Sequence, residues 1–336
     1  MKVLLITGSY PPDVCGVADY TTRLAAALNR KGIEVAALSG RMWHAANALK
    51  LRREIDGLRS DVLHVQYPAT GYGWGIGPQV LSVLRPMVAT IHECSQSHVL
   101  RRISLYPFTL RARAIVFTTE FEKRYAVRFA PWILHRSAVI PIGTNVPPAP
   151  LDIPRRSDAV TYFGLIRPQK GIEEVIQFSR LCLERSNGLC VRVVGALMPE
   201  NAGFYEQMRR AASGLPIEWI LGRDGPELSR TLAEGEIGYL PFPDGASERR
   251  GSLLAMLSNR TAVITSRGSH TPASLTNAVE FASSPFDAVL LAEQLSVNHT
   301  KRQSIQARAG EYAAEFDWDM IAEKHLDLYR SITIPK

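Results

Sequence analysis

Two basic residues, Arg167 and Lys170, stand three positions apart in the segment FGLIRPQKG, residues 163–171. They follow a short apolar run typical of a strand and precede a pattern of helical periodicity. Cations placed there could bind the phosphates of a ligand, because the free N–H groups of a helix N-terminus also favour an anion. Gly164 and Gly171 would let the backbone approach such a ligand closely. A solvated basic turn is the alternative, and the G-x-x-x-x-G-K-[ST] pattern of a P-loop is absent.

A second segment, GASERRGSLLAMLSN at residues 245–259, combines charges with the start of an apolar, helix-like run. Ser252 could cap this helix or donate to a phosphate, and the backbone at Gly251 and Leu253 would begin the helix beside an anion. In the alternative interpretation the charged residues only face water, as charge runs usually do. These charged residues are Glu248, Arg249 and Arg250.

In the N-terminal half, the loop SYPPDVCGVADY at residues 9–20 joins a predicted strand to a predicted helix. Gly16 leaves the first N–H groups of that helix open, and Asp19 lies one turn in. Loops in this position often bind ligands, although an ordinary connection is the alternative. His92 and Glu93 end another strand, VATIHE. A lone histidine is more often structural than catalytic, and only its position at a strand end makes His92 a candidate.

Apolar or β-branched runs alternate with helical patterns along the whole chain, which predicts parallel sheets with crossover helices. Residues 145–159 contain four prolines and no periodicity, and we interpret them as a linker between domains. Before the linker, strands are predicted at residues 3–7, 34–38, 61–65, 87–91, 114–118 and 138–142. After it, strands are predicted at residues 160–163, 190–194, 217–221, 237–240 and 262–265. Helices are predicted from residues 172, 204, 226 and 252, and the tail from Pro285 is mostly helical.

The predicted fold class is therefore α/β, with two Rossmann-like, doubly wound parallel-sheet domains facing a central cleft. Open sheets of this kind bind ligands at the carboxyl ends of their strands. We predict an N-terminal domain at residues 1–148, a C-terminal domain at 149–316 and a final helix within 317–336.

The composition is that of a globular protein. Of 336 residues, 46% are hydrophobic and 21% are charged, and no apolar run approaches the roughly 20 residues that cross a bilayer. The start, MKVLLITGSYPP, is too short for the core of a signal peptide. The four cysteines form no C-x-x-C pair and no zinc-like cluster, which favours a reducing cytoplasm over a disulfide framework. We expect no bound metal and no cofactor.

Nearly all of the formal charge of +7 comes from residues 97–136, which hold eight basic and two acidic residues. The basic residues are Arg101, Arg102, Arg111, Arg113, Lys123, Arg124, Arg128 and Arg136, and the acidic ones are Glu120 and Glu122. Such a local field attracts anionic partners. No nucleic-acid-binding module is recognisable, so nucleic acid is not an expected partner.

Aromatic residues interleave with these charges near one predicted helical face: Phe121, Tyr125, Phe129 and Trp132. They could form a core stripe beside a solvated face. Alternatively, the region could dock on an anionic membrane that holds a lipid-linked acceptor, at the inner face of the cell membrane.

Six segments together resemble a known family. In chain order they are PPDVCGVADYTTRLAAAL, TIHE, VIPIGTN, YFGLIRPQKGIEEVI, RRGSLLAMLSNRTAVIT and FDWDMIAEKHLDLYR. The chain resembles the retaining glycosyltransferases of family 4, which have the GT-B fold. The resemblance covers nearly the whole chain, whereas each motif alone would be weak evidence.

The resemblance implies a metal-independent, retaining transfer of a sugar from a nucleotide diphosphate sugar to an acceptor hydroxyl, in polysaccharide or glycolipid assembly. It implies that Arg167 and Lys170 neutralise the leaving diphosphate and that His92 lies near the transferred sugar. The segment Cys15, Gly16 and Val17 would close over the diphosphate and the acceptor. The donor-binding residues so implied are Gly16, Val17, Gly164, Asp244, Glu248, Gly251, Ser252 and Leu253, and the acceptor-side residues are Asp19 and Tyr20. The final helix, residues 318–330, would pack back on the N-terminal domain.

Two positions depart from the family pattern. Leu165 stands where many members have an arginine, which here comes two residues later. Leu254 stands where a glutamate usually grips the nucleotide ribose, and the first glutamate of that pair aligns near Ala246. Nearby polar residues could replace that first glutamate: Asp244, Ser247 and Glu248.

Leu254 therefore supports a second hypothesis, a non-catalytic GT-B subunit that binds a nucleotide sugar or a partner protein. A dinucleotide-dependent dehydrogenase is a third hypothesis, and the missing G-x-G-x-x-G pattern disfavours it.

Overall fold

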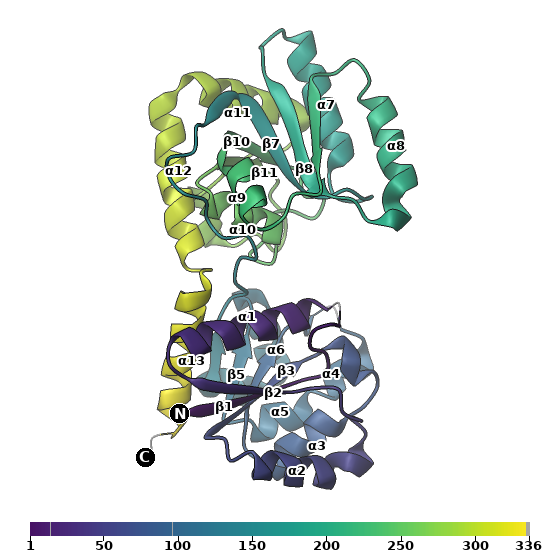
Figure 1. The fold of residues 1–336 in the computed structure, drawn as a ribbon, viewed down its shortest axis with the longest axis vertical. Helices are drawn as coiled ribbons and strands as arrows, with labels where there is room; N and C mark the ends of the chain where they lie inside the picture. The colour runs from purple at the N-terminus through teal and green to yellow at the C-terminus, as the bar shows by residue number, and fades with distance from the viewer. Residues whose placement is uncertain (14, 96, 334–336) are drawn as a thin grey trace. The chain divides into compact units, whose positions relative to one another are not determined.

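The computed structural model describes residues 1–13, 15–95 and 97–333. The chain divides into an N-terminal unit, Met1–Gly143 with Asp317–Lys336, and a C-terminal unit, Thr144–Phe316. Each unit contains one parallel six-stranded sheet with helices packed against it (Figure 1). The predicted α/β class with two doubly wound sheets is thus confirmed. No helix in the described ranges is long and apolar enough to cross a membrane.

The sheet of the N-terminal unit has the strand order β2-β1-β3-β4-β5-β6. Its strands are β1 (Lys2–Thr7), β2 (Glu34–Leu38), β3 (Val62–Tyr67), β4 (Val88–Ile91), β5 (Ala114–Phe117) and β6 (Ser137–Val139). Its helices are α1 (Gly16–Arg30), α2 (Ala48–Gly57), α3 (Gly77–Leu84), α4 (Val99–Ile103), α5 (Tyr106–Arg111), α6 (Glu120–Phe129) and α13 (Trp318–Thr333). Short 3-10 helices are η1 (Ala45–Asn47), η2 (Thr70–Tyr72) and η3 (Pro131–Arg136). Because β1, β3 and β4 are adjacent and parallel, the loops after them share one edge of the sheet.

The first strand and helix show how the sequence builds this unit. β1, KVLLIT, is buried at every residue after Lys2, as expected for a strand whose sheet is covered on both faces. α1 buries an apolar stripe that includes Tyr20 and Leu24 and exposes the opposite face. The helix ends at Arg30, and Gly32 then takes a φ of 77°, a left-handed conformation that favours glycine.

The terminal helix α13 is part of the same unit. Trp318 and Tyr329 of α13 belong to a buried cluster that also contains residues of β1 and α1. Arg30 of α1 pairs with Asp319 at 2.6 Å, but both side chains are exposed, so this pair adds about 1 kcal/mol at most. Apolar burial is therefore what holds α13 on the sheet.

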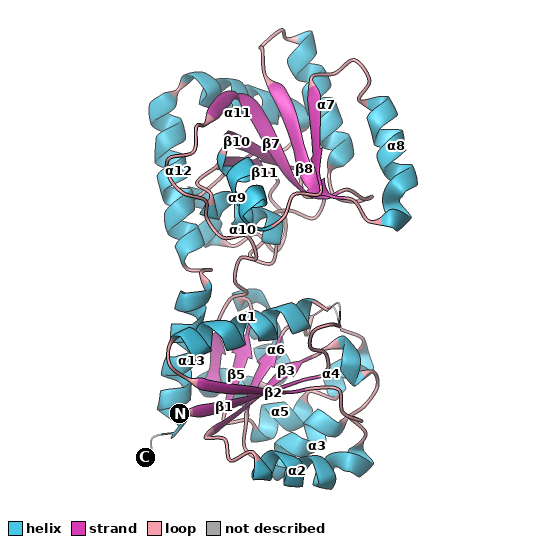
Figure 2. Ribbon diagram, in the orientation of Figure 1, coloured by secondary structure: helices cyan, strands magenta, loops and turns pink. Residues whose placement is uncertain are grey.

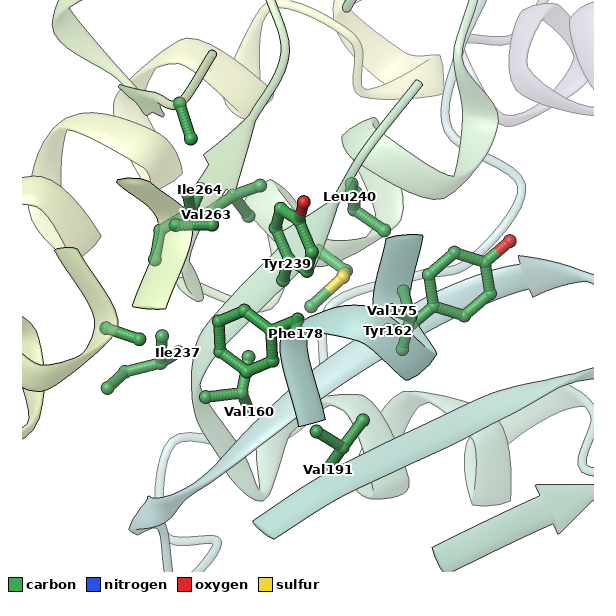
Figure 3. Packing of buried hydrophobic residues seen from close by; sticks show 14 of the residues in the cluster. Val160, Tyr162, Val175, Phe178, Val191, Ile237, Tyr239, Leu240, Val263 and Ile264 are labelled. Carbon is green, nitrogen blue, oxygen red and sulfur yellow. The ribbon is translucent and has the colours of Figure 1, made fainter. Parts of the chain in front are cut away.

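The sheet of the C-terminal unit has the strand order β12-β11-β10-β7-β8-β9. Figure 2 shows its strands in magenta with helices in cyan around them. Its strands are β7 (Arg156–Leu165), β8 (Cys190–Ala196), β9 (Ile217–Leu221), β10 (Gly235–Leu240), β11 (Ala262–Thr265) and β12 (Glu280–Phe281). Its helices are α7 (Ile172–Glu184), α8 (Ala202–Ala211), α9 (Gly225–Ala233), α10 (Gly251–Ser258), α11 (Pro285–Val297) and α12 (His299–Ala314), with 3-10 helices η4 (Pro199–Asn201) and η5 (Ala273–Asn277). Figure 3 shows its core, where Phe178 of α7 lies 4.9 Å from Tyr239 of β10 between ring centroids.

Three details differ from the sequence prediction. β7 begins at Arg156, inside the predicted linker, because Arg156 pairs in register with Gly235 of β10. Its first residues alternate between exposed and half-buried, so they carry no apolar signal. The short strand β12 was not predicted, and the two units divide after Gly143 rather than after residue 148.

Candidate functional site

The loops that follow β7 and β10 lie at one edge of the C-terminal sheet, because these strands are parallel neighbours. The loop after β7 carries Arg167 and Lys170. The loop after β10 carries Asp244 and leads into α10 through Arg250. The sequence segments 163–171 and 245–259, which are distant in the chain, therefore meet at one edge of the sheet.

The loop after β7 is held in one shape by its neighbours. The Tyr162 hydroxyl donates to the backbone oxygen of Lys170 at 2.9 Å. Gly171 has a φ of 79°, and a Cβ there would collide with the backbone oxygen of Pro241, so only glycine fits. This close packing fixes Lys170 against the loop that follows β10.

Positive charge gathers at this edge. The pKa of Lys170 lies below its ordinary value, chiefly because of partial burial and then because of the positive charges of Arg167 and Arg250. The negative charge of Asp244 acts to raise the pKa of Lys170. Three cations are therefore close enough to repel one another, and a bound anion would relieve that repulsion.

Arg250 is a residue that sequence reasoning undervalued. The sequence left open whether Arg250 only faces water. In the structure its guanidinium pairs with Asp244 and lies 4.9 Å from the ring centroid of Phe242. This stacking and pairing turn Arg250 toward the loop edge rather than into solvent. No local pattern could have predicted it, because its relation to Lys170 depends on the pairing of β7 with β10.

The N-terminus of α10 adds backbone donors to the same edge. Arg250 is its N-cap residue and makes no side-chain capping bond, so Ser252 is not the cap and instead lies in the first turn. Gly251 is exposed, and nothing lies within 4 Å of where its Cβ would be. The first N–H groups of a helix have no partner within the helix, so this turn can donate to an anion. The Leu253 side chain is buried, which leaves only its backbone available.

The two departures from the family pattern lie in this region. Leu254 is 2% exposed, so an apolar side chain is buried where a ribose-binding carboxylate was expected. Glu248 accepts a bond from the Tyr312 hydroxyl at 3.5 Å, which directs at least one of its oxygens toward α12. Asp244 is the more exposed carboxylate and is engaged with Arg250.

In the N-terminal unit, His92 follows β4 and is 7% exposed. Its Nε2 lies 3.0 Å from Gln66 Oε1, and its backbone N–H donates to Tyr67 at 2.8 Å. The Tyr20 ring meets the imidazole edge-on at 4.7 Å. His92 is thus held at a strand end by side chains from β3 and α1.

The predicted role of Tyr20 needs correction. Tyr20 is 2% exposed, and its hydroxyl lies 3.3 Å from Nε2 of His325 in α13. It packs in the core and supports His92 rather than presenting itself to an acceptor. Asp19, by contrast, is exposed in the first turn of α1, and Gly16 at the start of that helix is also exposed.

Sequence reasoning missed the role of Glu122. This carboxylate is 1% exposed and accepts bonds from the backbone of Cys94 and Ser95, at 2.9 and 3.0 Å, and from the Ser95 hydroxyl. It thereby fixes the loop that follows His92. Thr119 accepts a bond from the backbone N–H of Glu122, as in a capping box, but that sequence pattern predicts a local helix cap and not the contact with Cys94 and Ser95.

Cys15 is expected to react with iodoacetamide near neutral pH about a hundredfold faster than Cys94. Burial raises the pKa of the Cys15 thiol, but hydrogen bonds from Thr70 and from the backbone of Ala18 and Val17 outweigh it and set the pKa to about 7. Burial raises the pKa of Cys94 to about 12. Timed alkylation followed by peptide mass spectrometry measures both rates.

Thr70→Val removes the hydroxyl that lies 3.4 Å from the Cys15 sulfur and is expected to slow this reaction. Equal alkylation rates at Cys15 and Cys94 in the folded protein would contradict the prediction that the Cys15 thiol has the lower pKa.

Outside residues 14, 96 and 334–336, no group of three or more His, Cys, Asp and Glu side chains is placed to hold a metal ion.

The fold defines a class: two Rossmann-like, doubly wound domains of the GT-B type. Three cations gather at one sheet edge of the C-terminal domain. Residues 37–146 match the family model described as Glycosyltransferase Family 4. This match confirms, over residues 37–146, the resemblance to family 4 glycosyltransferases that the sequence motifs indicated.

Solved structures agree on the fold. A glycosyltransferase from Rickettsia africae has a TM-score of 0.73 at 12% identity and covers 100% of this chain and 99% of its own. Anabaena HepE in complex with UDP and glucose has a TM-score of 0.67 at 13% identity. The match covers 98% of this chain and 100% of the HepE chain. Sucrose-phosphate synthase from Thermosynechococcus elongatus has a TM-score of 0.61 at 15% identity, with 99% of each chain covered. No curated protein matches the sequence.

Proposed function

We propose that the protein transfers a sugar from a nucleoside diphosphate sugar to an acceptor hydroxyl, with retention at the anomeric carbon and without a metal ion. The acceptor is a saccharide or a lipid-linked glycan in polysaccharide or glycolipid assembly. The observation that carries the donor class is the set of cations, Arg167, Lys170 and Arg250, beside the open first turn of α10. Anabaena HepE, whose structure was solved in complex with UDP and glucose, has a similar fold, which supports the proposal.

The reaction breaks the bond between the anomeric carbon and the diphosphate oxygen, and the bonding electrons leave with the diphosphate. Negative charge therefore grows on the leaving group as the bond lengthens. Fixed cations and N–H donors aimed at that charge stabilise the transition state, because they need no reorganisation during the reaction. The acceptor oxygen forms the new bond to the anomeric carbon and gives its proton to the departing diphosphate, on which negative charge has grown.

The N-terminal unit would bind the acceptor. Gly16 and Asp19 are exposed at the start of α1. His92 follows β4 at the same edge of the sheet as the loop before α1, and Gln66 holds its ring. We propose that His92 contacts a sugar hydroxyl, with Gln66 fixing the orientation of its ring.

A non-catalytic subunit that binds a nucleotide sugar is the second candidate, because Leu254 leaves no carboxylate at the expected ribose position. Calorimetry with UDP, GDP and ADP and their glucose or mannose conjugates, followed by an assay of donor hydrolysis and transfer, separates the candidates. Binding with turnover supports the transferase. Binding without turnover supports the subunit, and the absence of any binding removes both.

The affinity for a nucleoside diphosphate is expected to fall with rising pH, beginning at a lower pH than an ordinary lysine would give. The pKa of Lys170 is lowered, and only its protonated form attracts the anion. Lys170→Arg keeps the charge at all accessible pH values, so it should move the decline to higher pH. Titration calorimetry with UDP across the alkaline range measures this, and identical pH profiles for the two proteins would exclude Lys170 as the titrating group.

A further inference from the structure

The short helix α4, Val99–Ile103, exposes its apolar side chains to solvent and turns its arginines toward the protein. Its apolar residues Val99, Leu100 and Ile103 are 58%, 61% and 56% exposed. Its two arginines are only partly exposed and are turned against the protein. A surface helix of a globular protein normally does the opposite.

The arginines are held inward by specific contacts. Arg101 donates to the backbone of Gly73 at 2.9 Å, and its guanidinium lies 5.8 Å from the ring centroids of Tyr67 and Trp74. Arg102 donates to the backbone of Ser97 at 2.8 Å and also to the Tyr125 hydroxyl. These bonds fix the rotation of α4, so its apolar face stays directed outward.

Further exposed apolar side chains belong to neighbouring segments. Trp74 is 77% exposed and is joined to α4 through Arg101. Leu110 of α5 is 58% exposed, and Tyr106 of α5 lies 6.3 Å from the ring of Trp132, which is 45% exposed. We call this set the apolar surface: Trp74, Val99, Leu100, Ile103, Leu110 and Trp132.

Cations without carboxylate partners lie in the same segment of the chain. Among the described residues, no ion pair involves the side chains Arg111, Lys123, Arg124 and Arg128. Of the two acidic residues of this segment, Glu122 is buried and bonded to Cys94 and Ser95, so only the exposed Glu120 stands against these four cations at the surface. The segment therefore joins exposed apolar groups to uncompensated positive charge.

We propose that the apolar surface docks on an anionic lipid bilayer. The aliphatic and indole side chains would enter the interface between headgroups and acyl chains. The cations without ion pairs, among them Arg124 and Arg128, would contact lipid phosphates. A second copy of this chain fits less well, since it would bring its own unpaired cations against these. The docking residues differ from those that the sequence suggested, because Tyr125 and Phe129 pack against the core and only Trp132 of that stripe is on the apolar surface.

The test uses the full chain in flotation assays with vesicles of phosphatidylcholine and phosphatidylglycerol, and with vesicles of phosphatidylcholine alone. Binding is expected only with phosphatidylglycerol and should weaken with added salt. Leu100→Ser with Ile103→Ser should lower partitioning about tenfold or more. Arg124→Gln with Arg128→Gln should lower it about fivefold per charge removed and flatten the salt dependence.

The matched control is Val297→Ser with Leu151→Ser, two apolar residues of the C-terminal unit that are 76% and 77% exposed. These changes should leave vesicle binding intact. Donor hydrolysis should be unchanged in all of these variants, so failure of docking and failure of the proposed reaction are distinguishable.

Three results would overturn the docking proposal. One is the absence of binding to either vesicle, and another is equal binding to both with no effect of the arginine variants. The third is self-association or capture of a protein that depends on Leu100 and Ile103 in the absence of vesicle binding.

Discussion

Replacing Arg167 and Lys170 together with glutamine is expected to lower donor cleavage by a factor of about 10² to 10³ or more. Both side chains are placed at the edge of the C-terminal sheet where Arg250 and the first turn of α10 also lie. Their charges favour a leaving diphosphate more than the intact donor, because the negative charge increases as the bond breaks. The loss should therefore appear mainly in kcat, measured by release of the nucleoside diphosphate.

The control for charge alone is Arg210→Gln, an exposed arginine of α8 in the same unit. It should leave turnover unchanged. The pair Arg167→Lys with Lys170→Arg should recover part of the lost rate, because it restores both charges with altered geometry. If the double glutamine variant cleaved donor as fast as the natural sequence, the anion site would have to lie elsewhere.

The pattern of the sequence predicts this fold well because both sheets are buried between helices. Strands β2, β9 and β11 have the predicted bounds, since each apolar run stops where its turn begins. The start of β7 could not be predicted in this way. Arg156 is in the strand only because β10 lies beside it, and that pairing joins residues far apart in the chain.

The site was predictable only where its residues are local to one motif. Arg167 and Lys170 share one loop, so their spacing after a strand was informative. Arg250 joins them through Phe242, Asp244 and the packing of two loops, none of which leaves a short-range signal. Tyr20 was misassigned for the same reason, because its partner His325 is 305 residues away in sequence.

The contact between Tyr20 and His325 belongs to a buried polar network in the N-terminal unit. His325 accepts or donates at both ring nitrogens, 3.3 Å from the Tyr20 hydroxyl and 2.9 Å from the backbone oxygen of Ile321. Since a carbonyl can only accept, Nδ1 carries the proton and neutral Nε2 accepts from Tyr20.

His64 is also fully buried. The Tyr329 hydroxyl lies 2.6 Å from its Nδ1, and the Thr90 hydroxyl lies 2.7 Å from its Nε2. Hydroxyl groups and a carbonyl surround both rings, and these contacts include no carboxylate to stabilise an imidazolium.

Acidification is therefore expected to destabilise the N-terminal unit. Burial lowers the pKa of His325 to about 4 and also lowers the pKa of His64. In the unfolded chain a histidine has a pKa of about 6.5, so the unfolded state takes up the proton first as the pH falls. The contribution of these neutral histidines to the free energy of unfolding is therefore complete above about pH 6.5 and is lost progressively toward pH 4. The loss from His325 amounts to about 3 kcal/mol, and His64 adds to it in the same direction.

Hydrogen exchange measured by mass spectrometry at about pH 7.5 and about pH 4.5, corrected for intrinsic rates, follows the two units separately. Peptides from β3, β4 and α13 should lose protection in acid by a factor of about 10². His325→Gln should reduce this loss because the titrating group is gone, whereas His44→Gln, at an exposed histidine, should not. Equal acid sensitivity in His325→Gln and the natural sequence would mean that His325 is not the group that takes up the proton. Because Tyr20 links His325 to His92, protonation of this network is also expected to disturb the imidazole proposed to contact the sugar.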